Sequence, residues 1–447
     1  MKAGRVSVMV VALAASARAD IAIKQVGFSD GDDWEPAIAV DGRYVYVAWA
    51  HIGAPQQDSS GAVCRTRGVT SYAYFQRSTS SGATWEPYIL PRCPVSGTQI
   101  DLQVAVGPHH RVYVSYMDGR QANTNIELIY SDDRGATWSS PINVASRGGG
   151  DKDVLLVDPG GGVMVAYEHL SSSYVAYSPD PTTTAFSHIK VSPPPGAGHG
   201  TSLATGGIRD SHGNTYLVWT DVTGNSKHDS YLWLARSSDH FATYTTSLID
   251  RSYAADVDVG AGWDYWGAAV QIAAIPRAGN DRLVVIYNAG TSAGAAQRIY
   301  TKYSDTLGAS WNIPYSASSY PSGAELSTAP IGAWHGFPAI AATAAGVKVI
   351  WQDNRVKYPC TSSVTPGACG RFNSYTRTST DGVTWTSEAR VQLPTTHRYQ
   401  VTTPAPGGFY HPYGDYTSMA TDGTTTWGVW GEGTSYNGPG TIYTATF

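Results

Sequence analysis

A short turn pattern recurs along this chain and limits the folds available to it more than any other feature. The pattern is Ser-x-Asp-x-Gly-x-Thr-Trp, and each copy follows a strand-like segment of alternating apolar residues. In a tight turn of this kind the Asp or Ser side chain accepts hydrogen bonds from turn amides, and the Gly adopts a positive φ. The copies are residues 131–138, 304–311, 78–85 (with Ser80 in place of the Asp), 379–385 (one residue shorter), a degraded copy at 237–244 and a weaker one at 178–186.

Such a repeat predicts a β-propeller, in which every blade reuses the same strand–turn–strand unit. The pattern resembles the Asp-box, also called the BNR repeat, of sialidases and their relatives. In that arrangement the turns join the third and fourth strands of each blade on the back of the ring. We therefore expect them to support the fold rather than to take part in chemistry.

A second repeat gives the number of blades. Each unit has an apolar strand, a turn and a second strand that ends in a buried-type aromatic residue, and the chain contains seven such units. We predict an all-β protein made of a single seven-bladed propeller with four-stranded antiparallel blades; a six-bladed ring is the alternative. The seventh unit ends after its third strand, so residues 21–28 are expected to supply the fourth and close the ring. The strand-ending aromatics are Trp49, Tyr116, Tyr167, Trp219, Tyr287, Trp351 and Trp430.

The first residues have the features of a signal peptide. Lys2 and Arg5 form a basic start, residues 6–15 are an apolar run, and Ala17-Arg18-Ala19 is a typical cleavage site. We predict a signal peptide at 1–19, a propeller at 20–447, and a secreted (extracellular or periplasmic) protein. The apolar run is too short to cross a membrane.

Net charge and cysteine content indicate which binding partners and which disulfides to expect. The formal net charge is −5 at pH 7 and no basic run exists, so nucleic acid is not an expected partner. We expect a monomer without a membrane span. In an exported protein the four cysteines predict the disulfides Cys64–Cys93 and Cys360–Cys369, with free buried thiols as the alternative.

Ionisable residues recur two positions after the strand-ending aromatics, near the face where the ligand pocket of the ring is expected. They form a polar rim around a central pocket, or they cap the strands by bonding to loop amides. Both interpretations stay open. The residues are His51, Asp118, His169, Asp221, Asp353 and Glu432, with Ala289 in the fifth unit.

The loops on this face carry further candidates. Arg120, Arg355 and Arg371 could bind a substrate carboxylate in a bidentate manner, or pair internally with Asp118 and Asp353. Aromatic residues beside carboxylates suit a sugar site, by stacking on ring faces and transferring protons. A Tyr-rich propeller with solvated aromatics is the alternative. The candidates of this kind are Asp33, Glu35, Trp334, His335, His411, Tyr413, Asp415 and Tyr416.

Motifs for other chemistry are missing from the sequence. It contains no His-Glu-x-x-His and no Cys-x-x-Cys. We therefore expect no cofactor and no zinc site. The carboxylate clusters could bind calcium, although no complete Asp-x-Asp-x-Asp-Gly loop with a closing Glu is present.

The repeats, Asp151-Lys152-Asp153 and Gly414-Asp415-Tyr416 resemble secreted bacterial proteins of the sialidase superfamily over nearly the whole mature chain. The resemblance implies a carboxylate-binding set of three arginines, a tyrosine nucleophile primed by a glutamate, and an aspartate as acid and base. The arginines would be Arg120, Arg355 and Arg371, the nucleophile Tyr416 or Tyr413, the glutamate Glu432 or Glu35, and the acid Asp33 or Asp415.

Three functions remain at this point. The first is a secreted sialidase-like exo-glycosidase that acts on acidic glycans through a central pocket. The second is a polysaccharide lyase on uronic-acid polymers, for which His51, His169, His335 and His411 are available. The third is a non-catalytic propeller that binds a glycan or a protein at its rim.

Overall fold

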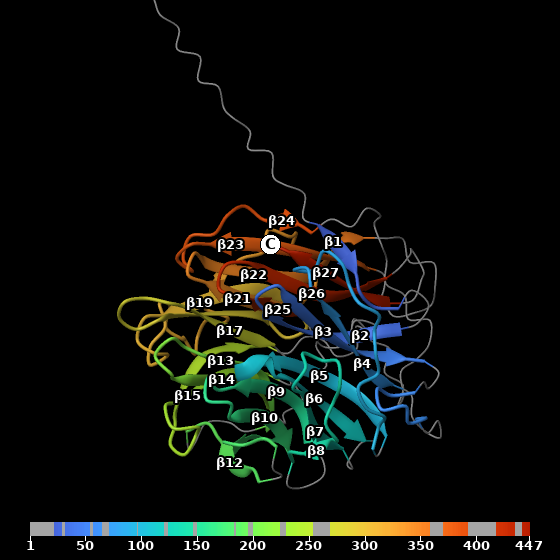
Figure 1. The fold of residues 1–447 in the computed structure, drawn as a ribbon. Helices are drawn as coiled ribbons and strands as arrows, with labels where there is room; N and C mark the ends of the chain where they lie inside the picture. Colours follow the sequence, from blue (N-terminus) through green and yellow to red (C-terminus); the bar gives the residue numbers. More distant parts are fainter. Residues whose placement is uncertain are drawn as a thin grey trace, which may run out of the picture.

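The computed structural model describes residues 22–28, 32–53, 57–64, 71–95, 97–119, 124–145, 150–182, 185–194, 200–223, 229–253, 269–357, 370–391, 417–433 and 440–447. Within these ranges the strands form seven antiparallel sheets. In Figure 1 the sequence colours pass once around the molecule, from blue through green and yellow to red. The innermost strands of successive sheets contact one another, and the last of them contacts the first. The predicted seven-bladed propeller is therefore confirmed, and the six-bladed alternative is excluded.

The blades follow one another along the chain, with the innermost strand first. Blade 1 is β2 (Asp32–Asp41), β3 (Tyr44–Ile52) and β4 (Tyr72–Ser78); blade 2 is β5 (Thr98–Val106), β6 (Val112–Gly119), β7 (Asn125–Ser131) and β8 (Ile142–Asn143); blade 3 is β9 (Gly150–Val157), β10 (Val163–His169), β11 (Ser172–Ser178) and β12 (Ser187–Val191); blade 4 is β13 (Gly200–Arg209), β14 (Thr215–Thr223), β15 (Ser230–Ser237) and β16 (Thr245–Ser252).

The remaining blades have the same order. Blade 5 is β17 (Val270–Ile275), β18 (Arg282–Ala289), β19 (Arg298–Ser304) and β20 (Ala324–Glu325); blade 6 is β21 (His335–Thr343), β22 (Gly346–Lys357), β23 (Gly370–Ser379) and β24 (Ala389–Arg390); blade 7 is β25 (Ser418–Thr421), β26 (Thr426–Gly433), β27 (Gly440–Thr446) and β1 (Ile23–Gln25). The described residues include one short 3₁₀ helix, η1 (Pro108–His110).

The ring closes by pairing its two ends, as predicted. β1 is antiparallel to the C-terminal strand β27, with Ile23 opposite Ala445 and Gln25 opposite Tyr443. Figure 1 shows the blue β1 beside the red β27. The N-terminal strand therefore covers an edge of blade 7 that would otherwise be unpaired.

Blade 1 departs from the four-stranded prediction. After β4 the returning segment makes one isolated bridge, in which Phe75 and Ile89 exchange two backbone hydrogen bonds of 2.9 Å. Prolines at 87, 91 and 94 surround this bridge. Because proline has no N–H to donate to a ladder, the segment cannot extend into a regular strand.

The repeated turns lie between third and fourth strands, and their hydrogen bonds are those predicted. The Ser131 hydroxyl accepts from the Gly135 amide at 2.6 Å, and Asp133 Oδ1 accepts from the Thr137 amide at 2.8 Å. Gly135 has φ of 90°, and a Cβ there would lie 2.5 Å from the Phe75 ring. In the turn at 304–311, Thr306 stands at the Asp position, and its Oγ1 accepts a hydrogen bond from the Ser310 amide at 2.9 Å.

The strand-ending aromatics form the packing between blades. Trp49, Trp219, Trp351 and Trp430 are fully buried. Trp49 lies in one hydrophobic cluster with Trp427 of blade 7, and Trp219 lies in one with Val154 of blade 3, so each cluster spans two adjacent blades. Burying a side chain of this size contributes roughly 2–3 kcal/mol each, which makes the second strand the centre of each blade interface.

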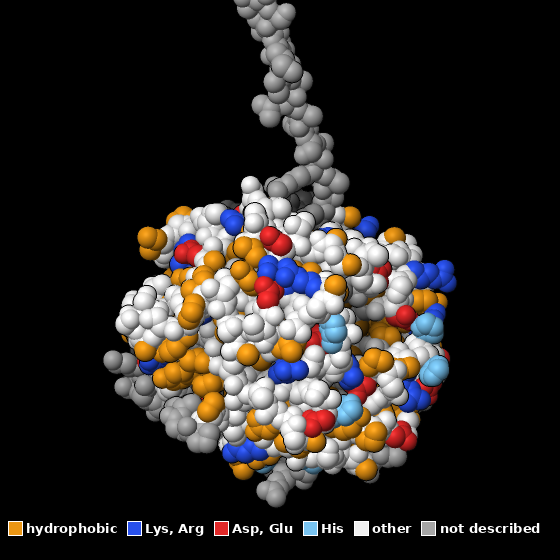
Figure 2. All heavy atoms as spheres, turned by 90° about the vertical axis from the view of Figure 1, so that its left-hand side faces the viewer, with side chains coloured by type: hydrophobic (Ala, Val, Ile, Leu, Met, Phe, Trp, Pro, Cys, Tyr) orange, Lys and Arg blue, Asp and Glu red, His pale blue; other side chains and the backbone are white. Residues whose placement is uncertain are grey.

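One predicted disulfide is present, and several predictions fall outside the described residues. Cys64 and Cys93 are bonded with a Cα–Cα distance of 5.2 Å. Cys360 and Cys369, and the predicted signal peptide at 1–19, lie outside. Among the residues described, no helix is long and apolar enough to cross a membrane. On the face shown in Figure 2, charged side chains of both signs are interspersed.

Candidate functional site

The innermost strands are distorted near the end at which each begins. The ladder between the first and second strands shifts register in blades 1, 2, 3, 4 and 6, within a few residues of that end. Three of these distortions hold a charged residue at positive φ: Glu35 at 53°, Asp101 at 54° and Lys152 at 50°. Left-handed backbone is costly for such residues and recurs where a side chain must be aimed.

These three residues, from blades 1, 2 and 3, contact one another. Glu35 Oε2 accepts a hydrogen bond of 2.6 Å from the Asp101 backbone amide. Lys152 Nζ lies 3.3 Å from Asp101 Oδ1. All three are buried. The distortion of each blade therefore directs a side chain to its neighbour, and we call Glu35, Asp101 and Lys152 the bulge cluster.

Asp153, next to Lys152, adds a third carboxyl to this group. Its Oδ2 accepts a hydrogen bond from the Ser115 hydroxyl of blade 2. Its Oδ1 is buried and, in the part of the chain that the structure describes, has no hydrogen-bond partner. Burial, and then the nearby carboxylates of Asp101 and Asp151, raise the pKa of Asp153 well above its usual range, although the Ser115 bond opposes the shift.

Asp101 and Asp153 thus lie in different surroundings although they are neighbours. Asp101 is ion-paired with the ammonium of Lys152, whereas the described contact of Asp153 is with a neutral hydroxyl. Two carboxyls held in opposite environments are the arrangement by which an enzyme keeps one protonated and one ionised at the same pH.

Asp33 and His51, both predicted site residues, form a buried pair at the ring closure. His51 Nδ1 lies 2.7 Å from Asp33 Oδ1, and the Trp49 indole donates to the same oxygen at 3.1 Å. Asp33 Oδ2 accepts from the Phe28 amide and from the Thr441 hydroxyl of β27. Burial raises the pKa of Asp33 to about 6, while the His51 bond opposes the shift. Asp33 therefore ties the segment after β1, and strand β27 of blade 7, to blade 1.

The other rim carboxylates make contacts typical of caps. Asp118 accepts hydrogen bonds from the amides of Val95 and Gly97 at 2.6 and 2.9 Å. The indole of Trp430 donates to Glu432 at 3.1 Å, as that of Trp351 does to Asp353. Burial raises the pKa of Glu432 to about 8.

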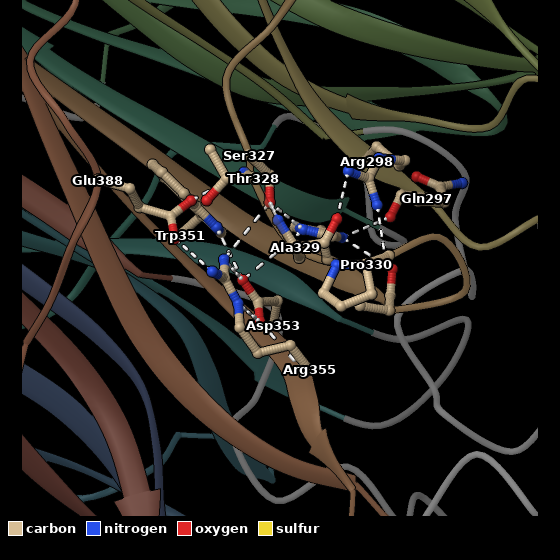
Figure 3. A network of polar contacts seen from close by, with 12 residues as sticks. Gln297, Arg298, Ser327, Thr328, Ala329, Pro330, Trp351, Asp353, Arg355 and Glu388 are labelled. Carbon is tan, nitrogen blue, oxygen red and sulfur yellow. Dashed lines mark hydrogen bonds and ion pairs between the residues drawn. The ribbon is translucent and has the colours of Figure 1, made fainter.

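Arg355 is held within blade 6, as Figure 3 shows. Its Nε and Nη2 bind the two oxygens of Asp353 at 2.7 and 2.5 Å, and its Nη1 pairs with Glu388. Its guanidinium carbon also lies 3.6 Å from the centre of the Tyr375 ring. These contacts match the internal brace that the sequence left open as an alternative to substrate binding.

The neighbouring loop, 326–334, is fixed by the same network. Arg298 donates to the carbonyls of Pro330 and Ala329 at 3.0 and 2.8 Å (Figure 3). His335 follows this loop and lies 2.6 Å from the Ser327 hydroxyl, and its burial lowers its pKa. Half-buried Trp334 ends the loop.

His169 differs from the other two described histidines of the rim. It is 7% exposed, and neither ring nitrogen has a hydrogen-bond partner in the described structure. Its ring meets the edge of Tyr174 at a centroid distance of 5.8 Å.

The remaining candidates lie outside the described residues: Arg120, His411, Tyr413, Asp415 and Tyr416. Arg371 lies in β23, and its side chain is not described. The arginine set and the tyrosine nucleophile therefore stay predictions. Sequence reasoning missed Asp101, although it occupies the same place before its strand as Glu35 and Lys152; aligning the first strands of all blades would have found it.

One group among the described residues has the geometry of a cation site. Ligand atoms of Asp210, His212 and Asp281 all lie within 4.8 Å of one another. Asp281 already accepts hydrogen bonds from the amides of Ser211 and Arg277, at 2.7 and 3.0 Å. These carboxylate oxygens serve the turn, so the group does not support the calcium alternative.

Comparison with known proteins finds similarity in fold but not in sequence. No family model matches the sequence, and no curated protein matches it. Among solved structures, an ulvan lyase of polysaccharide lyase family PL25 has a TM-score of 0.54 at 9% identity, over 94% of this chain and 95% of the lyase. The α-L-arabinanase of Penicillium chrysogenum, complexed with arabinobiose, has a TM-score of 0.50 at 11% identity, over 96% and 98%.

A sialidase from Trypanosoma rangeli is also similar, with a TM-score of 0.42 at 10% identity, over 93% of this chain and 54% of the sialidase. At these identities the likeness concerns the fold. The chain thus shares, over nearly its full length, the propeller architecture of proteins that act on carbohydrates.

Proposed function

We propose that the protein is a secreted glycoside hydrolase that cleaves a glycan at the interface of blades 2 and 3. Asp153 would act as the general acid and Asp101 as the ionised partner. The observation that carries the proposal is this pair of carboxyls. Asp153 accepts a hydrogen bond from a neutral hydroxyl and has one oxygen without a described partner, whereas Asp101 is ion-paired with Lys152.

The chemistry follows from the two environments. Cleavage of a glycosidic bond needs a proton on the leaving oxygen and a carboxylate that activates water or attacks the sugar. Burial destabilises the ionised form of Asp153 and raises its pKa, which favours the protonated form that a general acid needs. Lys152 stabilises the negative charge of Asp101, and Glu35 holds the Asp101 backbone in place through its amide.

The fold and the sequence support an extracellular glycan as substrate. The described structures that share the fold at a TM-score of 0.50 or above are an arabinanase and an ulvan lyase, and the Cys64–Cys93 disulfide suits an oxidising compartment. The sequence resemblance to the sialidase superfamily favours one kind of hydrolase, an exo-glycosidase of sialidase type that acts on acidic glycans. In our proposal Arg355 supports blade 6 rather than the substrate, because Asp353 and Glu388 occupy its guanidinium.

Activity of the purified mature chain on a panel of glycans tests the proposal. Sialyl-lactose, linear arabinan and ulvan cover the three substrate types, and released reducing sugar is the measurement. We expect hydrolysis of at least one, with Asp153→Asn and Asp101→Asn each lowering kcat by at least about a hundredfold. Asp132→Asn, an exposed carboxylate in the repeated turn of blade 2, is the control and should retain most of the activity.

The other functions give distinct results in the same experiment. An unsaturated product that absorbs in the ultraviolet would identify a lyase. Binding of a glycan without any product would identify a binding propeller. Full activity of Asp153→Asn, with an unchanged pH profile, would refute the assigned acid.

A further inference from the structure

The connection between the second and third strands is shorter in blade 3 than in the other blades. β10 ends at His169 and β11 begins at Ser172, so two residues, Leu170 and Ser171, make the turn. Both have positive φ, 49° and 61°, as a two-residue hairpin requires. The same connection in blade 5, between Ala289 and Arg298, takes eight residues.

This short hairpin leaves its tip open to solvent. Leu170 is 78% exposed, one of the most exposed large apolar side chains among the described residues. The connection lies on the same side of the ring as the bulge cluster, because both are near the end where the inner strand begins and the second strand ends. At the described β10–β11 connection, a chain that extends from the carboxyl pair would meet a turn of only two residues.

His169 lies directly below this tip, and a comparison with other blades shows why it has no partner. In blade 1, the residue opposite His51 across the ladder is Asp33, which binds its ring. In blade 3, the residue opposite His169 is Gly150. Glycine offers no side chain, so the imidazole is buried with both nitrogens unused.

A buried imidazole without partners loses its hydration and gains nothing in return, unless a ligand supplies the missing bonds. The neutral ring has one donor and one acceptor. A sugar hydroxyl is also both donor and acceptor, so it can bond to either of the two nitrogens. Gly150, opposite His169, is three residues from Asp153, which is roughly 10 Å along a strand.

We infer that His169 forms a second sugar-binding position beside the carboxyl pair, for a glycan chain that leaves the cleavage point over the blade 3 hairpin. The inference rests on the proposed function and adds to it that the substrate has further sugars beyond the bond that is cut. Leu170 would contact the apolar face of a sugar ring as the chain leaves the protein.

Binding measured in the Asp153→Asn variant tests this inference without turnover. The probes are linear arabino-oligosaccharides and ulvan oligosaccharides of increasing length, from the disaccharide upward, and calorimetry gives Kd. In the added variant His169→Ala, we expect Kd for the longer probes to rise about tenfold, while Kd for the disaccharide stays the same. His169→Gln, which keeps a donor and an acceptor, should restore part of the affinity.

Two controls separate binding from folding. His51→Ala removes the equivalent, partnered histidine of blade 1, and it should lower the melting temperature without changing how Kd depends on chain length. A glycine-rich insertion between Leu170 and Ser171 lengthens the hairpin and should weaken the binding of long probes, with His169 intact. The side-chain NMR signals of His169 should shift when a long probe is added.

The outcomes also separate this inference from the proposed function. Hydrolysis by the wild-type protein with the same length dependence in His169→Ala would overturn the inference and leave the hydrolase in place. Neither binding nor cleavage of any probe would overturn both. Unshifted His169 signals on binding of a long probe would show that an ordered water, rather than the glycan, meets this ring.

Discussion

Glu432 allows a direct test of how burial acts on a rim carboxylate. Burial raises its pKa from 4.5 to about 8, and the described contact of its carboxyl is the Trp430 indole at 3.1 Å. Between about pH 5 and pH 8 the folded protein keeps this proton, whereas the unfolded chain releases it. Since the unfolded state then binds fewer protons, the free energy of unfolding falls as the pH rises through this range.

The size of the effect follows from one proton. The unfolding equilibrium should shift about tenfold per pH unit, or about a thousandfold from pH 5 to pH 8, which is about 4 kcal/mol. Glu432→Gln keeps an oxygen for the Trp430 indole and cannot ionise. The difference in unfolding free energy between variant and wild type should therefore grow with pH in favour of the variant.

Urea unfolding followed by tryptophan fluorescence, repeated across this pH range, measures that difference. Glu86→Gln is the control, because Glu86 is a partly exposed surface residue paired with Arg77 and its replacement also removes one negative charge. A constant difference between Glu432→Gln and wild type from pH 5 to pH 8 would refute the reasoning. It would mean that Glu432 is ionised in the folded protein and is reached by water.

Three further results are expected. Cys93→Ser opens a loop with a sequence separation of 29 and should cost about 3 kcal/mol, seen as a lower melting temperature; an unchanged melting temperature would contradict this. Asp133→Ala should cost about 1–2 kcal/mol of stability, because the turn hydrogen bonds stabilise the Asp133 carboxylate and lower its pKa to about 2. This stabilisation should fade as the pH falls from 4 toward 2. The control Asp132→Ala removes one exposed ion pair and should change stability by less than about 1 kcal/mol. Arg355→Ala should cost about 3 kcal/mol or more by stranding a buried carboxylate, and an unchanged melting temperature together with lost activity would show that it binds substrate instead.

The fold could be predicted because its strongest signals are local. In the turn at 131–138, Ser131 and Asp133 bind amides that lie at most four residues away, so the sequence of the turn specifies its structure. The aromatic that ends each second strand marks one blade, and the count of such residues gave the count of blades. Blade 1 has no regular fourth strand among the described residues because prolines at 87, 91 and 94 interrupt the segment after β4.

The carboxyl pair was harder to predict because it depends on register shifts. Asp101 comes directly before the apolar residues Leu102–Val106, and it takes positive φ at the register shift between Ile100 and Gln103. Its contacts reach 66 residues back to Glu35 and 51 residues forward to Lys152. A pattern read along one strand contains no information about either contact.

The roles of the rim residues were also hard to predict from one strand, but the residue across the ladder helps to assign them. A histidine or carboxylate two positions after the aromatic was equally open to a structural or a functional role, because the sequence of the second strand alone does not say what faces it. The ladder supplies the answer: Asp33 faces His51, His335 faces Asp353, and Gly150 faces His169. His51 and Asp33 bind each other, whereas His335 binds the Ser327 hydroxyl and Asp353 binds Arg355. In the third pair the imidazole has no hydrogen-bond partner among the described residues. A search for function in a propeller should therefore compare each rim residue with the residue across the ladder, and begin where that residue is glycine.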